Sequence, residues 1–241
     1  MRNILVIFII LVCFSTVKAD FIEGQALYVT AHSGLKLRTS PVIGKTIEVI
    51  PFGSEVQFIS HKEAESKGHE IDWVKGNWIE VEYNGLLGFV FDGFLTSLPI
   101  PTHDFELNQI DMGLLYPFES WILYHFVLNP SEMDTISNHN GFAKVRIDFD
   151  QGSWTKQNKK DVFKAELILN HGRIMDVYHI LLAMYKDPAK KATFENKTIF
   201  MKNEEGEVNN IKIASEELIT IRKLSDGKLR VRILTSERGC I

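Results

Sequence analysis

The chain has 241 residues, with 27 basic and 31 acidic side chains and a formal net charge of −4 at pH 7. This length is sufficient for two domains with hydrophobic cores. The charge balance offers no basic face for a phosphate backbone, so we expect neither nucleic acid nor a strongly anionic polymer as a partner. The only cysteines are Cys13 and Cys240, which excludes a disulfide framework.

Residues 1–19 have the pattern of a secretory signal peptide. Arg2 precedes an uncharged apolar run, Ile4–Phe14, and Ala19 suits cleavage before Asp20. An uncleaved membrane anchor is the first alternative. The apolar run covers only residues 4–14, whereas spanning a bilayer takes roughly 20 apolar residues. We therefore predict an exported protein, periplasmic or secreted, with no stable membrane span after cleavage.

Cys13 raises a second alternative, a lipoprotein cut just before a lipidated cysteine. Val12 stands where that pattern requires a small residue, which disfavours it. Cleavage before Asp20 leaves Cys240 as the last cysteine. We interpret Cys240 as a free terminal thiol, with an intermolecular disulfide as the sharper alternative and a catalytic nucleophile as the least favoured one.

The segment from Ala26 to Leu98 contains short runs with strand character, separated by turn residues. The Asn84-Gly85 pair predicts a tight hairpin, because both positions tolerate positive φ. Several short strands at close spacing predict a small barrel or sandwich. The runs are 26–30, 35–38, 46–50, 55–59, 78–83 and 88–91.

Four motifs in this segment occur in the order found in bacterial SH3-like (SH3b) domains. They are Gly34-Leu35-x-Leu37-Arg38-x-x-Pro41, Ile50-Pro51-x-Gly53-x-x-Val56, Trp78-x-x-Val81-x-Tyr83-Asn84-Gly85 with Gly88-Phe89-Val90, and Phe94-Leu95. Residues 26–98 therefore resemble that family. The resemblance implies a small β-barrel over residues 20–98 that acts as a binding or targeting module for a peptide, a cell-wall fragment or a protein.

The segment departs from the family pattern at three places. Phe89 stands where the family commonly has Trp, and Leu86-Leu87 replace a polar pair. The predicted loop from His61 to Lys75 is longer than usual and carries Trp73. These departures leave the barrel in place and put the standard ligand groove in question.

Pro99-Ile100-Pro101 predicts a short, stiff linker at residues 99–101. Residues 102–241 then predict a second β-rich domain, with an α+β domain as the alternative. Residues 118–128 and 177–185 are compatible with either a helix or a buried strand. Strands are predicted at 143–149, 162–169, 198–201 and 210–213, and a hairpin joins 218–223 to 228–233 around Ser225-Asp226-Gly227.

The sequence contains no pattern that requires catalysis, a metal or a cofactor. No Gly-x-Ser-x-Gly elbow is present, and no two histidines are spaced four apart as in helical zinc sites. Asp148 and Asp150 share one strand face, and Glu204, Glu205 and Glu207 flank a glycine. Solvent exposure is the better interpretation of these carboxylates.

Aromatic side chains remain as candidate ligand-binding residues. Trp78 and Tyr83 are on predicted barrel strands, where core packing is the alternative role. Trp73 is in the polar loop and could stack on a ligand or pack onto the barrel. We therefore expect an exported, non-catalytic binding protein. The alternatives are an envelope hydrolase with its active site in the C-terminal domain and a β-barrel carrier of a small apolar ligand.

Overall fold

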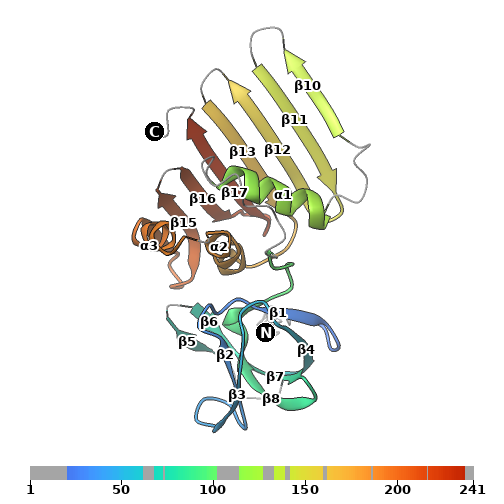
Figure 1. Cartoon of the computed structure of the whole chain (residues 1–241), viewed down its shortest axis with the longest axis vertical. Coiled ribbons are helices and arrows are strands. Elements are labelled where there is room, and N and C mark those ends of the chain that lie inside the picture. The colour runs from blue at the N-terminus through green and yellow to red at the C-terminus, as the bar shows by residue number, and fades with distance from the viewer. Residues whose placement is uncertain are drawn as a thin grey trace, which may run out of the picture.

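The computed structural model describes residues 21–61, 68–72, 74–101, 114–126, 133–138, 142–159, 162–185, 187–215 and 217–236. The predicted leader, Trp73 and Cys240 lie outside these residues. The described chain forms two large antiparallel sheets, a small two-stranded sheet and three α-helices (Figure 1). The prediction of a mainly β protein with two β-rich domains is confirmed.

The first domain, called here the barrel domain, contains the described part of residues 21–98. Its seven-stranded sheet has the order β3-β2-β8-β7-β4-β1-β9 and wraps around a core that includes Leu27, Leu37 and Val81. The strands are β1 (Ala26–Val29), β2 (Leu35–Arg38), β3 (Thr46–Ile50), β4 (Glu55–Ser60), β7 (Trp78–Tyr83), β8 (Leu86–Phe91) and β9 (Leu95–Thr96). A 3-10 turn, η2 (Asp92–Phe94), separates β8 from β9.

The predicted strand runs of this domain agree with the observed ones to within two residues. Asn84 and Gly85 adopt φ of 51° and 78° and connect β7 to β8, as the hairpin prediction requires. The predicted loop from His61 to Lys75 needs correction, because it contains a small hairpin of β5 (His69–Ile71) and β6 (Val74–Gly76). Alternation there is too short to be recognised in the sequence.

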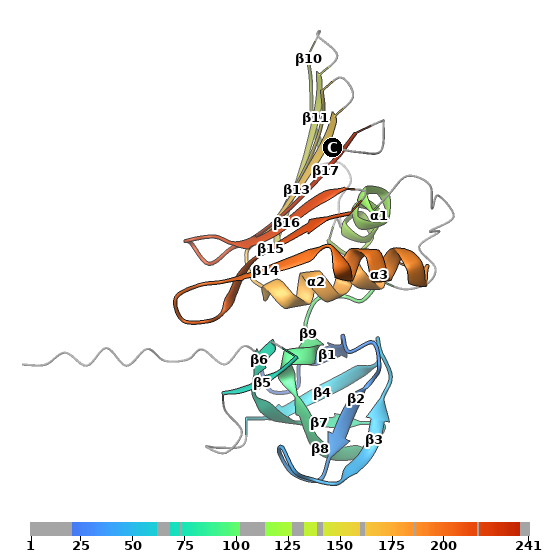
Figure 2. The same cartoon turned by 90° about the vertical axis from the view of Figure 1, so that its left-hand side faces the viewer.

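The second domain, called here the sheet domain, contains the described part of residues 114–236. Its eight antiparallel strands have the order β10-β11-β12-β13-β17-β16-β15-β14. The strands are β10 (Met133–Asn138), β11 (Phe142–Phe149), β12 (Gly152–Lys159), β13 (Val162–Leu169), β14 (Thr198–Lys202), β15 (Val208–Ala214), β16 (Leu218–Lys223) and β17 (Leu229–Ser236). The helices α1 (Leu115–Phe126), α2 (Ile174–Ala183) and α3 (Pro188–Asn196) lie on one face of this sheet (Figure 2).

The two segments that the sequence left open between helix and strand are the helices α1 and α2. In α1, Phe118, Trp121 and Ile122 are fully buried, and the Phe118 ring meets the Trp154 ring of β12 edge-on at 5.7 Å. In α2, the residues from Val177 to Leu182 are all buried. One side of α2 packs on β15 and β16 and the other faces the barrel domain, which explains why the helix is buried on nearly all sides and lacks a polar face.

The segment predicted as a linker, residues 99–101, packs against the sheet domain. Ile100 is 8% exposed and belongs to the core of the sheet domain, together with Leu98. The Pro99 carbonyl accepts a 2.9 Å hydrogen bond from the Trp121 indole nitrogen of α1. No helix among the described residues is long and apolar enough to cross a bilayer.

Candidate functional site

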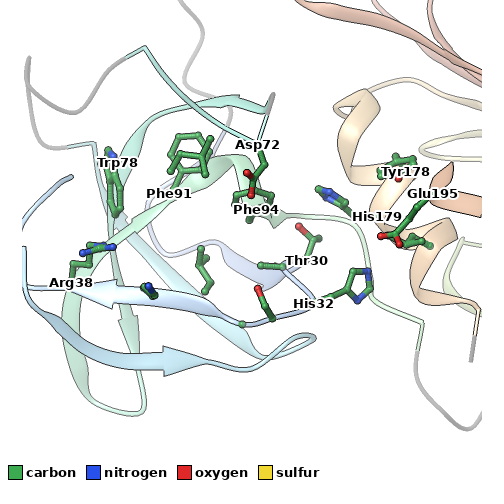
Figure 3. A pocket seen from close by; sticks show the side chains of 17 residues that line it. Thr30, His32, Arg38, Asp72, Trp78, Phe91, Phe94, Tyr178, His179 and Glu195 are labelled. Carbon is green, nitrogen blue, oxygen red and sulfur yellow. The ribbon is translucent and has the colours of Figure 1, made fainter. Parts of the chain in front are cut away.

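A pocket of about 590 Å³ lies between the barrel domain and the helices α2 and α3 (Figure 3). It is open to solvent on one side, and its volume is in the range of small-ligand sites. Both domains line it. The barrel domain contributes Thr30, Ala31, His32, Ser33, Gly34, Leu35, Lys36, Arg38, Ile71, Asp72, Trp78, Phe91 and Phe94, and the sheet domain contributes Tyr178, His179, Leu182 and Glu195.

One end of the pocket is an aromatic wall with a cation beside it. The rings of Trp78 and Phe91 are 6.1 Å apart, and Phe94 follows at 5.8 Å from Phe91. The Arg38 guanidinium carbon lies 5.7 Å from the centre of the Trp78 ring, within cation–π distance. The aromatic rings at this end can therefore pack on an apolar group of a ligand, and the Arg38 guanidinium can donate to a ligand oxygen.

Local backbone geometry places Arg38 at this wall. A register shift between Leu37 and Arg38 occurs where β2 meets β3, and Arg38 pairs with Phe89 of β8. A Cβ on Gly88 would lie 2.8 Å from the Arg38 carbonyl oxygen, so only glycine allows β8 to approach β2 this closely. Arg38 Nη1 then donates to the Gly44 carbonyl at 2.8 Å, while its buried Nε has no partner among the described residues.

At the other end of the pocket, Thr30 comes from the barrel domain and His179 from α2 of the sheet domain. Thr30 is 1% exposed and His179 is 8% exposed. Neither Thr30 Oγ1 nor His179 Nδ1 has a hydrogen-bond partner within the described chain. Figure 3 shows both side chains at the space between the barrel strands and α2. Unpaired buried polar atoms are costly in a folded protein, and a ligand is one way to satisfy them.

Both histidines of this end are neutral at physiological pH. Burial, with the nearby charges of His32 and Arg173, lowers the pKa of His179 to about 3. Burial, followed by the charge of Lys191, lowers the pKa of His32 to about 4. The His32 ring stacks on Phe52 at 4.7 Å and an interplanar angle of 15°. A neutral imidazole offers one donor and one acceptor nitrogen, so this end suits an uncharged polar group.

The side chain of Arg173, at the start of α2, holds the two walls together. Its Nη1 donates to the Asp92 carbonyl at 2.9 Å, and its Nη2 donates to the Leu95 carbonyl, both in the barrel domain. Its Nη2 also lies 2.9 Å from the Asp176 carboxylate, which is 3% exposed. Burial raises the pKa of Asp176, and the Arg173 charge opposes that shift.

A second contact joins the domains at the hairpin beside the pocket. Lys75 Nζ of β6 donates to the Glu205 carbonyl at 3.0 Å. Lys202 of β14 lies 3.6 Å from the Glu70 carboxylate of β5. The barrel domain thus meets the sheet domain through β5 and β6 as well as through α2, and the pocket lies beside these contacts.

The three predicted ligand-binding residues do not all lie at the pocket. Trp78 lines the pocket although it is only 6% exposed. Trp73 lies outside the described residues, and its neighbours Ile71 and Asp72 line the pocket. Tyr83, at the far end of β7, packs partly against the barrel core and does not line the pocket.

Sequence reasoning did not identify Thr30, Arg38 or His179 as site residues. Arg38 belongs to the Gly34–Pro41 motif. A charged residue at the end of a predicted barrel strand could have indicated a site residue there. Thr30 and His179 carry no such signal, because only the contact between domains brings them together. Among the described residues, no group of three or more His, Cys, Asp or Glu side chains is arranged to hold a metal ion.

The fold and the pocket define a two-domain, β-rich protein with a ligand-sized pocket between its domains. Comparison with protein-family models, with curated proteins and with solved structures found no match for this chain.

Proposed function

We propose that this protein is an exported binding protein and that it takes a short peptide segment, free or from a cell-wall fragment, in the pocket between its domains. One observation carries the proposal. Thr30, Arg38 and His179 line a single pocket that also has an aromatic wall, and each carries a buried polar atom (Oγ1, Nε and Nδ1) with no hydrogen-bond partner among the described residues.

A peptide has the chemistry that these groups require. Its carbonyl oxygens can accept from Arg38 Nε and from the Thr30 hydroxyl, and an amide group suits the neutral His179 ring. An apolar side chain of the peptide would pack on Trp78 and Phe94. The resemblance of residues 26–98 to SH3b domains, whose members commonly bind peptides or cell-wall fragments, supports the same assignment.

The pKa values of the pocket histidines favour binding over acid–base catalysis. General acids and bases work best with a pKa near the operating pH. His32 and His179 are held at about 4 and 3, so both remain neutral and act as fixed hydrogen-bonding groups. The open side of the pocket and the polar side chains among its lining residues also fit a peptide better than a small apolar ligand carried by a closed barrel.

The test is a binding measurement on the chain from Asp20 onward with soluble cell-wall peptide fragments and with purified sacculi. We expect saturable binding of the fragments by calorimetry, and co-sedimentation with sacculi. Thr30→Val removes one hydroxyl at nearly constant volume and is expected to weaken fragment binding by roughly fivefold to tenfold. Thr39→Val, on the surface of the same domain, is the matched control and is expected to leave binding unchanged.

The proposal fails if neither the fragments nor the sacculi bind. Binding that Thr30→Val leaves unchanged would place the ligand outside this pocket. Trp73→Ala tests whether the segment next to Asp72 contributes, since loss of binding in that variant extends the site to the β5–β6 hairpin.

A further inference from the structure

The sheet domain has one face that no described element covers. Along β11, Val145, Ile147 and Phe149 point to the core, and the helices α1, α2 and α3 lie on that side (Figure 2). Alternation then places Lys144, Arg146 and Asp148 on the opposite side. The same alternation holds along β12, β13, β15, β16 and β17, and the side away from the helices is called here the open face.

The open face is strongly basic although the chain as a whole is acidic. Among the side chains that the structure describes on β11–β13 and β15–β17, seven basic ones lie on it against two acidic ones. The basic residues are Lys144, Arg146, Lys164, Lys212, Arg222, Arg230 and Arg232, and the acidic residues are Asp148 and Glu166. The net charge of the whole chain is −4, so folding concentrates positive charge on this one surface.

The two acidic side chains described on the open face, Asp148 and Glu166, are already paired. Asp148 lies 2.7 Å from Arg146, and Glu166 contacts both Arg230 and Arg232. Lys144, Lys164, Lys212 and Arg222 make no ion pair with any residue that the structure describes. The positive charge of the face is therefore in excess over its own internal pairs, and it is available to an external anion.

The cations are spread over an area rather than along a line. In the strand register, Arg146, Thr155, Glu166, Arg232, Thr220 and Lys212 form one row that crosses from β11 to β15. Adjacent strands are about 4.8 Å apart, so this row is about 24 Å long. Arg230 and Arg222 form the next row on one side, and Lys144 and Lys164 lie in the next row on the other side.

Apolar side chains border the cations at one edge of the sheet. Ile199 and Met201 of the edge strand β14 are 59% and 36% exposed. The register pairs Ile199 with Lys212 and Met201 with Asn210, which places both on the open face. Phe200, between them, turns to the helix side and meets the Tyr178 ring at 5.2 Å.

We propose that the open face docks on an anionic phospholipid surface. Its lysines and arginines would meet the headgroup phosphates, and Ile199 and Met201 would insert at the level of the headgroups. A two-dimensional array of cations with exposed aliphatic side chains at its edge matches such a surface. No aromatic side chain is described on the open face, so it lacks the stacking platform typical of single-stranded nucleic acid sites.

The test is a vesicle sedimentation assay with the chain from Asp20 onward, which removes the apolar Ile4–Phe14 run. We expect binding to vesicles of 30% phosphatidylglycerol in phosphatidylcholine, no binding to pure phosphatidylcholine, and loss of binding in 1 M salt. Lys212→Glu/Arg222→Glu removes two exposed cations. At about 1 kcal/mol for each cation, the affinity for anionic vesicles should fall roughly 30-fold or more.

The matched control is Lys45→Glu/Lys197→Glu, which makes the same change in net charge at exposed positions away from the open face. We expect the control to fall by less than threefold. An equal loss in both variants would show that net charge alone acts, and it would overturn the proposal. So would binding of soluble polyphosphate without binding of vesicles, because the face would then take a free polyanion.

Discussion

The Arg173 guanidinium at the start of α2 donates to the backbone carbonyl of Leu95, the first residue of the last barrel strand. The same group donates to the Asp92 carbonyl and pairs with the buried Asp176 carboxylate. One side chain therefore satisfies two carbonyls of the barrel domain and one carboxylate of the sheet domain. This arrangement makes Arg173 the central contact between the domains.

Arg173→Met is expected to lower the free energy of unfolding by about 3–5 kcal/mol, because it leaves the Asp176 carboxylate buried without its counter-charge. Urea unfolding, followed by tryptophan fluorescence and by circular dichroism, measures the loss. We also expect the transitions of the two domains to separate. The double variant Arg173→Met/Asp176→Asn should recover part of the loss, since it removes the unpaired charge. A cost below about 1 kcal/mol for Arg173→Met would contradict this role.

Thr30→Val is expected to stabilise the protein while it weakens ligand binding. The Thr30 hydroxyl is buried and has no partner within the described chain, so replacing it by a methyl group should raise the unfolding free energy by about 1 kcal/mol. Urea unfolding at pH 7 measures this change.

Thr96→Val is the control with the opposite sign. The Thr96 Oγ1 accepts a 3.0 Å hydrogen bond from the Leu98 amide, and its side chain also bonds Asp176. The same substitution at this buried site should lower the unfolding free energy by about 1–3 kcal/mol. If Thr30→Val destabilised the protein as much as Thr96→Val, the Thr30 hydroxyl would have an internal partner and would not belong to a ligand site.

The buried histidine of the pocket predicts a dependence of stability on pH. The pKa of His179 is about 3 in the folded protein, against 6.5 as its ordinary value. Between these values the unfolded chain binds a proton that the folded chain does not, so stability falls as the pH is lowered from about 6.5 towards 3. The stability conferred by keeping this ring neutral is fully present above pH 6.5.

His179→Phe should reduce the slope of unfolding free energy against pH by up to about 1.4 kcal/mol per pH unit in this range. Urea unfolding of the variant and the original chain at pH 7, 6, 5 and 4.5 measures the difference. Identical slopes for His179→Phe and the original chain would show that folding does not lower the pKa of His179, and they would contradict this prediction.

Much of the fold could be predicted from local patterns. The alternation in β11, β13 and β17 and the Asn84-Gly85 turn each predicted a strand or a hairpin that the structure contains. The strand β12 was missed because its segment, Gly152–Lys159, is polar except for Trp154. The helix α2 was ambiguous because burial on two sides removes the helical period.

The candidate site was less predictable, because it depends on the contact between domains. Thr30 and His179 are ordinary residues in sequence and line the same pocket only because α2 packs on the barrel domain. Charge composition hid the open face in a similar way. The second half of the chain is nearly neutral, yet the alternation in Lys144-Val145-Arg146-Ile147 and Arg230-Val231-Arg232-Ile233 already places cations on one side of the sheet.

The start of α1 depends on Glu217, a residue about one hundred positions later in the chain. The Glu217 carboxylate is 4% exposed and accepts from the Leu114 and Leu115 amides at 2.9 and 3.3 Å. These amides lack partners within the helix, so Glu217→Ala is expected to lower the unfolding free energy by about 3 kcal/mol. Glu217→Gln keeps one acceptor and should cost about half as much.

Urea unfolding of the two Glu217 variants and of Glu204→Ala measures this effect. Glu204 is exposed in the turn between β14 and β15, so its removal should change the unfolding free energy by less than about 0.5 kcal/mol. Near-equal values for Glu217→Ala and Glu204→Ala would show that α1 starts without this carboxylate. An unfolding free energy that rises from alanine to glutamine to glutamate at position 217 would instead show that this buried acceptor group stabilises the start of α1, the helix that covers β12.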